Sequence, residues 1–187
     1  FRRFARPVGP LLRELPLSGH KSSYGRNRRG KRPVHACHGL ERGLGERLTV
    51  FVRGGGTLVV TYASGYVDEH DLCFLGGFPG PLKELLGIWN EEIDALHDGE
   101  TRKVSWNGRQ YEARDFCERI HLEGASQIGR FDEDFYAGQP ALTVCPTGSG
   151  RSYYVAARLD DDFQDDFFGW LAGSLDIRRP LTRPAPT

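Results

Sequence analysis

The sequence predicts an α/β domain, and three neighbouring features support that prediction. Apolar residues recur at i, i+3 and i+4 spacing over residues 46–52, which predicts the last turns of a helix. Gly54 and Gly55 follow and supply the flexible backbone with which helices commonly end. Residues 57–62 are β-branched and apolar without alternation, as expected of a strand covered on both faces. A helix, a glycine stop and a buried strand form the second half of an α/β unit.

The length and composition of the chain bound the possible classes of protein. With 187 residues, the chain is long enough for one domain with a real core and short for two. Its hydrophobic content of 39% and aromatic content of 11% are typical of a globular protein. Its apolar runs are far shorter than the roughly 20 residues of a membrane helix, so no membrane partner is expected. Because the first residue is Phe1 and no secretory pattern follows it, we interpret the chain as a fragment or a processed piece.

The four cysteines are Cys37, Cys73, Cys117 and Cys145, which lie far apart without a CxxC pair. Secreted disulfide scaffolds are shorter and denser in cysteine. We therefore expect reduced, mostly buried thiols and a cytoplasmic location.

The zero net charge conceals two regions of opposite charge. Residues 1–47 contain 12 Lys/Arg and 3 Asp/Glu, a net charge of +9, whereas residues 48–187 contain 13 and 22, a net charge of −9. Residues 22–32 are basic and almost without apolar side chains, so they bury too little surface to offset their ordering entropy. The alternative function is a free-standing α/β binding module whose basic N-terminal arm holds nucleic acid or another acidic partner. The lack of a recognisable binding module argues against nucleic acid as a partner.

Two motifs have to be considered as possible binding sites, one for a metal ion and one for a phosphate group. His35, Cys37 and His38 are ligand types that zinc prefers, but a zinc site needs a fourth ligand and no second cluster lies nearby. The glycines at 54–56 follow a helix and open a strand, whereas a phosphate-binding loop follows a strand and opens a helix. We therefore expect no metal site and no cofactor.

The residues after the predicted strand invite a catalytic interpretation. Asp68, Glu69, His70 and Asp71 follow it closely and could supply a general acid and base. Acidic residues in a solvated loop are far commoner, so we expect none of these residues to be catalytic.

Residues 76–81 read Gly-Gly-Phe-Pro-Gly-Pro and cannot form a regular element, because proline lacks a donor and glycine adds freedom. We expect a shaped loop that Phe78 anchors. A short helix should follow over residues 82–86 and end at Gly87.

The later chain predicts a hairpin, several strands and a last helix. Asn107 and Gly108 form the turn of a hairpin over residues 103–113. Strands are predicted at residues 116–122, 126–131, 141–145 and 151–157. Acidic residues 160–162 open an amphipathic helix, where they complement the positive end of its dipole. A carboxylate metal site there would lack its remaining ligands.

These motifs together resemble a known family. Residues 55–62 (GGTLVVTY), 76–82 (GGFPGPL), 117–125 (CERIHLEGA) and 134–141 (DFYAGQPA) are similar, in the same order, to the middle domain of bacterial β-galactosidases of glycoside hydrolase family 42. The resemblance covers about residues 46–177 and implies a flavodoxin-like, class I glutamine-amidotransferase-like three-layer sandwich. In the family this domain follows the catalytic barrel and helps to assemble the homotrimer.

The resemblance implies a function in assembly rather than in catalysis. The intact enzyme would hydrolyse terminal β-D-galactosides with retention, using two glutamates on a covalently linked barrel that this chain does not contain. The expected site is an interface with further copies of the chain. Its candidate residues are Gly76, Gly77, Phe78, Pro79 and Gly80.

A shared fold does not carry over amidotransferase chemistry. Such a nucleophile sits on a sharp strand-to-helix elbow. Cys117, paired with His121, lies in an alternating strand, and Cys145 precedes a proline. We therefore expect neither thiol to act as a nucleophile.

The N-terminal part departs from the family pattern. Residues 17–21 resemble a family turn, but the apolar strand expected after it is replaced by the basic stretch. We hypothesise that residues 22 to about 45 come from a shifted reading frame, which leaves the sandwich incomplete at its N-terminus. The predicted domains are a basic, disordered or frame-shifted segment 1–45, the trimerisation domain 46–177 and a proline-rich linker 178–187.

Overall fold

The structure is a computed structural model that describes residues 39–176. The predictions for the basic stretch, for the turn at 17–21, for the His35–Cys37–His38 motif and for the linker lie outside the described residues. Within the described range no helix is long and apolar enough to cross a membrane.

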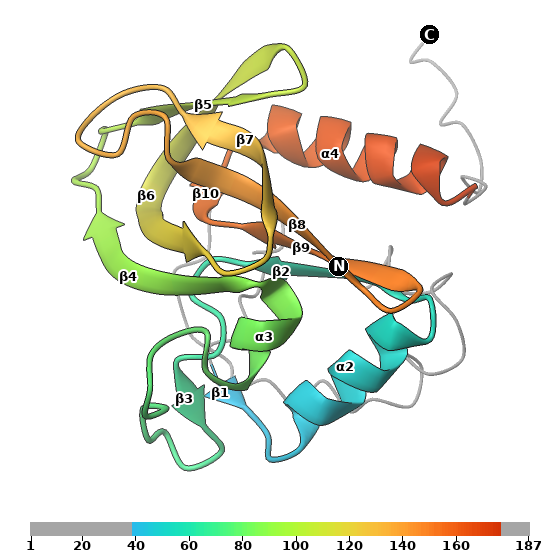
Figure 1. The fold of residues 1–187 in the computed structure, drawn as a ribbon. Helices are drawn as coiled ribbons and strands as arrows, with labels where there is room; N and C mark the ends of the chain where they lie inside the picture. The colour runs from blue at the N-terminus through green and yellow to red at the C-terminus, as the bar shows by residue number, and fades with distance from the viewer. Residues whose placement is uncertain (1–38, 177–187) are drawn as a thin grey trace, which may run out of the picture.

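The described chain contains three α-helices, one 3₁₀ helix and ten strands (Figure 1). The helical elements are α2 (Leu44–Arg53), η1 (Gly80–Leu82), α3 (Lys83–Leu86) and α4 (Asp161–Ser174). The strands are β1 (Gly39–Leu40), β2 (Thr57–Thr61), β3 (Val67–Asp68), β4 (Ile88–Ala95), β5 (Arg102–Trp106), β6 (Arg109–Leu122), β7 (Ser126–Phe131), β8 (Pro140–Thr147), β9 (Gly150–Val155) and β10 (Ala157–Leu159).

The main sheet has eight strands and is mixed. Its order is β10-β6-β5-β7-β8-β9-β2, and β4 pairs with β6 beside this path. Only β2 and β9 run parallel in this sheet, while its other pairs are antiparallel. The prediction of an α/β sandwich thus requires a correction: the described part is mostly sheet with few helices, and the flavodoxin-like arrangement is not confirmed. The hairpin-forming sequences after residue 88 explain this, because short turns join antiparallel strands.

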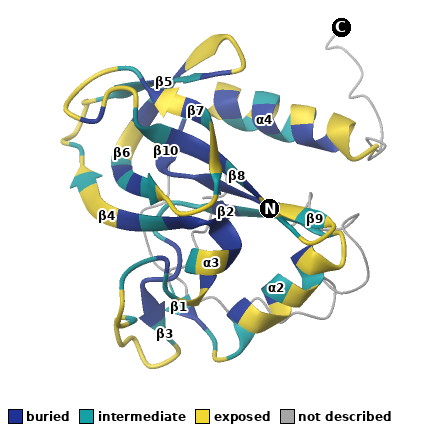
Figure 2. Cartoon of the chain, viewed as in Figure 1, coloured by how far each residue is buried: buried dark blue, intermediate teal, exposed yellow. Residues whose placement is uncertain are grey.

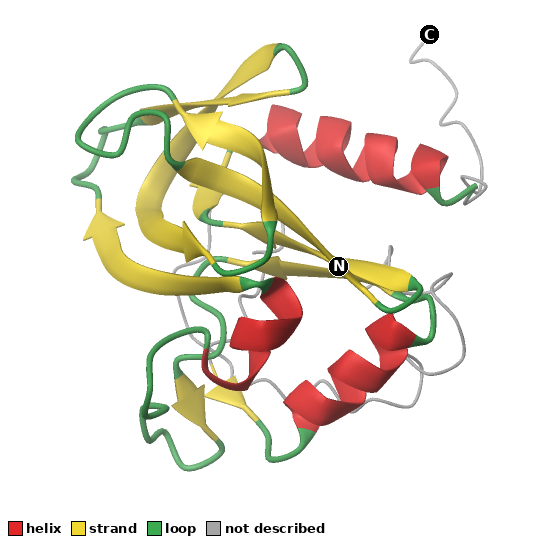
Figure 3. Cartoon of the chain, viewed as in Figure 1, coloured by secondary structure: helices red, strands yellow, loops and turns green. Residues whose placement is uncertain are grey.

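Helices cover both faces of the sheet (Figures 1 and 3). Helix α4 packs on one face, where Phe163 and Phe167 join a cluster with Trp106. Helices α2 and α3 lie on the other face with a second apolar cluster. The two clusters meet through β9, whose consecutive residues Tyr153 and Tyr154 face opposite clusters. Strand β9 is therefore buried on both sides.

Strand β2 forms where residues 57–62 predicted it, and apolar clusters lie on both of its faces, against Val59 on one and Leu58 and Val60 on the other, but the strand is less buried than predicted. Only Val60 is buried, and the other four residues are intermediate (Figure 2). The reason is its position: within the described residues β2 pairs with β9 alone and ends the sheet. An apolar sequence without alternation was therefore a sound predictor of a strand and a poor predictor of its place in the sheet.

Several local predictions are confirmed. Helix α2 ends at Gly54, and the next residue, Gly55, has a φ of 104°. The hairpin turn has φ values of 50° at Asn107 and 76° at Gly108, as a type I′ turn requires. The carboxylate of Asp160 caps α4 by accepting a hydrogen bond from the Phe163 amide at 2.9 Å.

The predicted strand at 116–122 is part of a longer strand. Strand β6 runs for 14 residues, pairing first with β5 and then with β4. Asp115, with a φ of 63°, lies between these two halves. Its polar character made one strand look like two.

Candidate functional site

The predicted interface residues lie in a loop that we call the Gly/Pro loop, residues 72–80. Its base is held by backbone and ring contacts around Phe78, whose peptide bond to Pro79 is cis. The Phe78 carbonyl accepts a hydrogen bond from the Asn90 amide at 2.9 Å. The Phe78 ring meets the Tyr66 ring edge-on, with centroids 4.4 Å apart. Phe78 is thus the anchor that the sequence predicted.

A second contact at the base requires glycine. Gly65 and Gly80 both have positive φ, 72° and 53°. A Cβ atom on Gly65 would lie 2.5 Å from the Pro79 carbonyl oxygen, and one on Gly80 would lie 2.9 Å from the Gly65 carbonyl oxygen. The turn at residues 63–66 therefore packs backbone to backbone against the Gly/Pro loop.

The tip of the loop is more exposed than its base. Of the predicted interface residues, Gly76 is exposed, Pro79 is buried, and Gly77, Phe78 and Gly80 are intermediate. Within the loop, the most exposed apolar side chains are Leu75 at 99% and Leu72 at 64% exposed, and neither was among the interface residues expected from the sequence. The signal for them was available, since leucines in a loop of glycines and acidic residues have no regular element through which to become buried.

A buried polar cluster lies beneath the turn at residues 63–66. Glu118 on β6 is 1% exposed, and its Oε1 accepts hydrogen bonds from the Ala63 amide at 2.8 Å and from the Tyr66 hydroxyl. Its Oε2 accepts one from the Tyr154 hydroxyl at 2.6 Å. The Tyr66 hydroxyl in turn accepts from Nδ2 of Asn90 at 2.8 Å. Four segments of the chain thus meet at one carboxyl group.

Glu118 was not among the residues expected from the sequence, although its position in the strand carried a signal. Glu118 and the buried Ile120 are two residues apart in a strand, so both point to the same face. A carboxyl group in the inward phase of a strand must find donors.

Burial dominates the electrostatics of this cluster. It raises the pKa of Glu118, an effect that the hydrogen bonds from Tyr154 and Tyr66 oppose. Burial and the neighbouring carboxyl group also raise the pKa of Tyr66 and of Tyr154 well above the ordinary value for tyrosine. Both hydroxyl groups therefore remain neutral donors.

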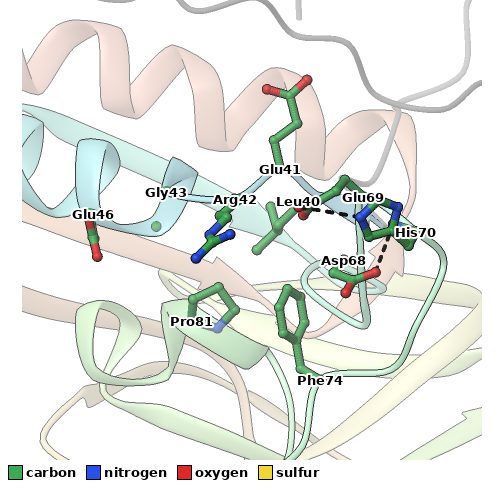
Figure 4. Close-up of a pocket in the computed structure, with 11 residues that line it drawn as sticks. Leu40, Glu41, Arg42, Gly43, Glu46, Asp68, Glu69, His70, Phe74 and Pro81 are labelled. Atoms are coloured by element: carbon green, nitrogen blue, oxygen red, sulfur yellow. Dashed lines mark hydrogen bonds and ion pairs between the residues drawn. The ribbon is translucent and has the colours of Figure 1, made fainter.

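A hollow of about 450 Å³ opens beside the acidic loop (Figure 4). Its floor includes Phe74 and Pro81, and charged side chains rim it. The rim residues are Glu41, Arg42, Glu46, Asp68, Glu69 and His70. Charges of both signs on an open rim do not define one ligand class.

The acidic loop has a structural role at Asp68. The Asp68 carboxylate accepts hydrogen bonds from the amides of Leu72, at 3.0 Å, and His70, at 2.8 Å. These two bonds lower its pKa, the Leu72 bond most. A carboxylate held as an acceptor for its own loop is a turn-forming group.

The thiols of the described residues are free, and Cys117 is protected. Cys117 is 1% exposed, and burial raises its pKa to about 11. A thiol that stays protonated is a poor nucleophile. Among residues 39–176 no group of three His, Cys, Asp or Glu side chains could hold a metal ion.

Comparison with known proteins places the chain. The family model described as "Beta-galactosidase trimerisation domain" matches residues 36–178. The β-galactosidase BglY of Alicyclobacillus acidocaldarius is 46% identical over 191 residues, which cover 98% of this chain and 26% of that protein. The β-galactosidase Pbg of Clostridium perfringens is 51% identical over 151 residues, which cover 77% of this chain and 22% of that protein.

Solved structures agree with the sequence relatives. The cold-adapted β-galactosidase of Rahnella sp. R3 superposes with a TM-score of 0.76 at 47% identity, over 80% of this chain and 23% of that chain. The β-galactosidase of Bacillus circulans sp. alkalophilus gives 0.75 at 38% identity, over 79% and 23%. The chain spans about a quarter of the length of the relatives it matches. It belongs to the family of β-galactosidase trimerisation domains of glycoside hydrolase family 42.

Proposed function

We propose that this domain assembles a homotrimer through the Gly/Pro loop. The observation that carries the proposal is Leu75, a leucine that is 99% exposed at the tip of a loop whose base is fixed. Leu72, at 64%, widens the apolar surface. A fixed apolar projection loses no further loop entropy when it is buried against a partner, which favours association.

A trimer sets a geometric condition on this surface. A ring of three identical chains uses head-to-tail contacts, so each chain offers two different patches. The Gly/Pro loop supplies one of them in this proposal. The five predicted interface residues have different roles in this proposal. Phe78, Pro79 and Gly80 fix the base of the loop, and Gly76 and Gly77 at its tip allow the partner's backbone to approach.

The activity of the complete protein is a proposal as well. The relatives are named as β-galactosidases, and we infer that the complete protein hydrolyses terminal β-D-galactosides with two carboxylates on a linked catalytic barrel. The 187-residue chain should then show no galactosidase activity. A chromogenic galactoside assay on the purified chain tests this, and measurable turnover would contradict it.

We propose three further properties of the protein. A flavodoxin-like arrangement of the whole domain is supported by the parallel pair β2 and β9 and by helices on both faces. A cytoplasmic location is supported by the free thiols of Cys73, Cys117 and Cys145. The frame-shift hypothesis for residues 22–45 is tested by sequencing the coding region.

Sedimentation equilibrium tests the assembly proposal. The wild-type chain should show the mass of three chains, and Leu75→Asp should shift the equilibrium toward one chain by at least tenfold in the association constant. The matched control is Val50→Asp, because Val50 on α2 is equally apolar, is 67% exposed and lies outside the loop. Equal association by Leu75→Asp and the wild type would refute the loop as the contact surface.

A further inference from the structure

The turn at residues 63–66 links the buried cluster to the Gly/Pro loop. Glu118 fixes the turn at both ends, through the Ala63 amide and the Tyr66 hydroxyl. Between these two residues, the Gly65 backbone touches the Pro79 carbonyl so closely that a Cβ atom would not fit. Any movement of the turn must therefore displace the base of the loop.

A second link runs through the Phe78 anchor. The Tyr66 ring that packs on Phe78 carries the hydroxyl group that donates to Glu118. The same hydroxyl accepts from the Asn90 side chain, and the Asn90 amide donates to the Phe78 carbonyl. Ring and backbone of Phe78 are thus both held by residues that Glu118 orients.

The donor count shows why an acidic side chain suits this position. Glu118 meets three donors: one amide and two tyrosine hydroxyls. A carboxyl group offers enough lone pairs for all three, whereas an apolar side chain offers none. Buried donors without an acceptor are costly, so an apolar replacement would favour opening of the turn to water.

We propose that Glu118 is the positioning residue of the Gly/Pro loop, which it holds in the shape that presents Leu72 and Leu75 to a second copy of the chain. The use of this loop shape in self-association rests on the proposed function. Glu118 thereby has a role in assembly, although it lies on β6 beneath the loop and is only 1% exposed.

The position of Glu118 also makes the loop sensitive to pH. The titratable groups that face it are Tyr66 and Tyr62 from the turn side and Tyr154 from β9, and all three have raised pKa values, with burial as the largest cause. Of these four groups, only Glu118 has an ordinary pKa below neutral. Its own pKa is raised by burial, so the closed turn favours the protonated form relative to an open, hydrated turn. Closure is then fully supported below the ordinary pKa of glutamate and weakens as pH rises through the raised pKa.

Hydrogen exchange of the 187-residue chain, followed by mass spectrometry, tests the inference. Glu118→Met should speed exchange in residues 72–80 by at least tenfold and weaken self-association. Glu118→Gln keeps one acceptor oxygen and cannot titrate. Residues 72–80 should therefore keep most of their protection from exchange in this variant, and that protection factor should no longer depend on pH. Glu123→Met is the matched control, because Glu123 is exposed just beyond the end of β6 and should change neither readout.

Tyr66→Phe keeps the inference testable if Glu118→Met does not fold. It removes one hydroxyl and retains the ring on Phe78, so loop exchange should rise a few-fold in a folded protein. Unchanged loop exchange in folded Glu118→Met and Tyr66→Phe would overturn the inference, as would the same pH dependence in Glu118→Gln and the wild type. If the variants at Glu118 and Tyr66 change exchange in the loop while Leu75→Asp leaves the mass of the particle unchanged, the positioning role of Glu118 is supported and the proposed contact surface is refuted.

Discussion

The two faces of the central sheet are stabilised by different kinds of interaction. On the α4 face, Trp106 packs against Phe163 and Phe167 with ring centroids 5.7 Å and 5.5 Å apart, inside a large cluster of buried apolar and aromatic side chains. On the opposite face an apolar cluster is joined by the Glu118 hydrogen bonds and by the Gly65–Pro79 backbone contact. Apolar burial is non-directional and supplies bulk stability, whereas hydrogen bonds and close backbone contacts specify one geometry. The apolar face therefore supplies most of the stability, and the opposite face fixes the shape of the loop.

The largest expected effect is on the apolar face. Phe163 is 0% exposed and contacts Trp106, Tyr111 and Phe167, so Phe163→Ala should lower the free energy of unfolding by about 3–5 kcal/mol. Urea unfolding followed by tryptophan fluorescence measures the loss. If the two faces are independent of each other, hydrogen exchange in residues 72–80 should become faster only because the whole domain unfolds more often. Faster exchange confined to that loop in Phe163→Ala would show that the apolar face also controls the shape of the loop.

On the opposite face, Gly65→Ala should combine backbone strain with a steric clash. The φ of 72° costs about 1 kcal/mol for a residue with a Cβ atom, and the contact with the Pro79 carbonyl adds to this. We expect a loss of about 2–3 kcal/mol, with faster exchange in the loop. Gly76→Ala is the matched control, since Gly76 also has a positive φ but open space around it. Equal losses for both variants would show that the close contact is unimportant.

A smaller effect is expected where α4 begins. Asp160 accepts hydrogen bonds from the Phe163 amide at 2.9 Å and from the Glu112 amide at 2.8 Å. Asp160→Ala should cost about 1–2 kcal/mol, the usual range for a lost cap. Chemical unfolding gives the value, and Asp161→Ala, one residue later, controls for the loss of an acidic residue near the same helix end. A loss below that of Asp161→Ala would count against the cap.

The smallest effect is a difference in reactivity without a change in stability. A maleimide reagent at pH 8 should label the exposed Cys73 quickly and leave Cys117 unlabelled, because burial raises the Cys117 pKa to about 11. Peptide mapping after a short pulse separates the two sites. Fast labelling of Cys117 in the folded chain would show that the core opens more readily than its burial implies.

Local sequence signals predicted the elements well and their arrangement less well. Asn107–Gly108 gave the hairpin and the acidic residues at 160–162 gave the start of α4, because turn and cap chemistry act within a few residues. The place of β2 at the end of the described sheet depends on distant partners, which no local pattern encodes. Phe78 was identified as an anchor from its glycine and proline neighbours. Leu75 and Glu118 were missed although each carried a local signal, the loop context of Leu75 and the inward strand phase of Glu118. Distant segments decide how far each side chain is finally exposed or buried.

Hydrogen exchange of the wild-type chain at increasing protein concentration locates the surface through which the chain associates. As the concentration of the wild-type chain rises, residues 72–80 should gain protection while α4, Asp161–Ser174, stays unchanged. That result would place self-association on the Gly/Pro loop and stability on the apolar face. The second patch of a head-to-tail contact should gain protection as well. No gain of protection in residues 72–80 while the mass of the particle increases would contradict the proposed contact surface.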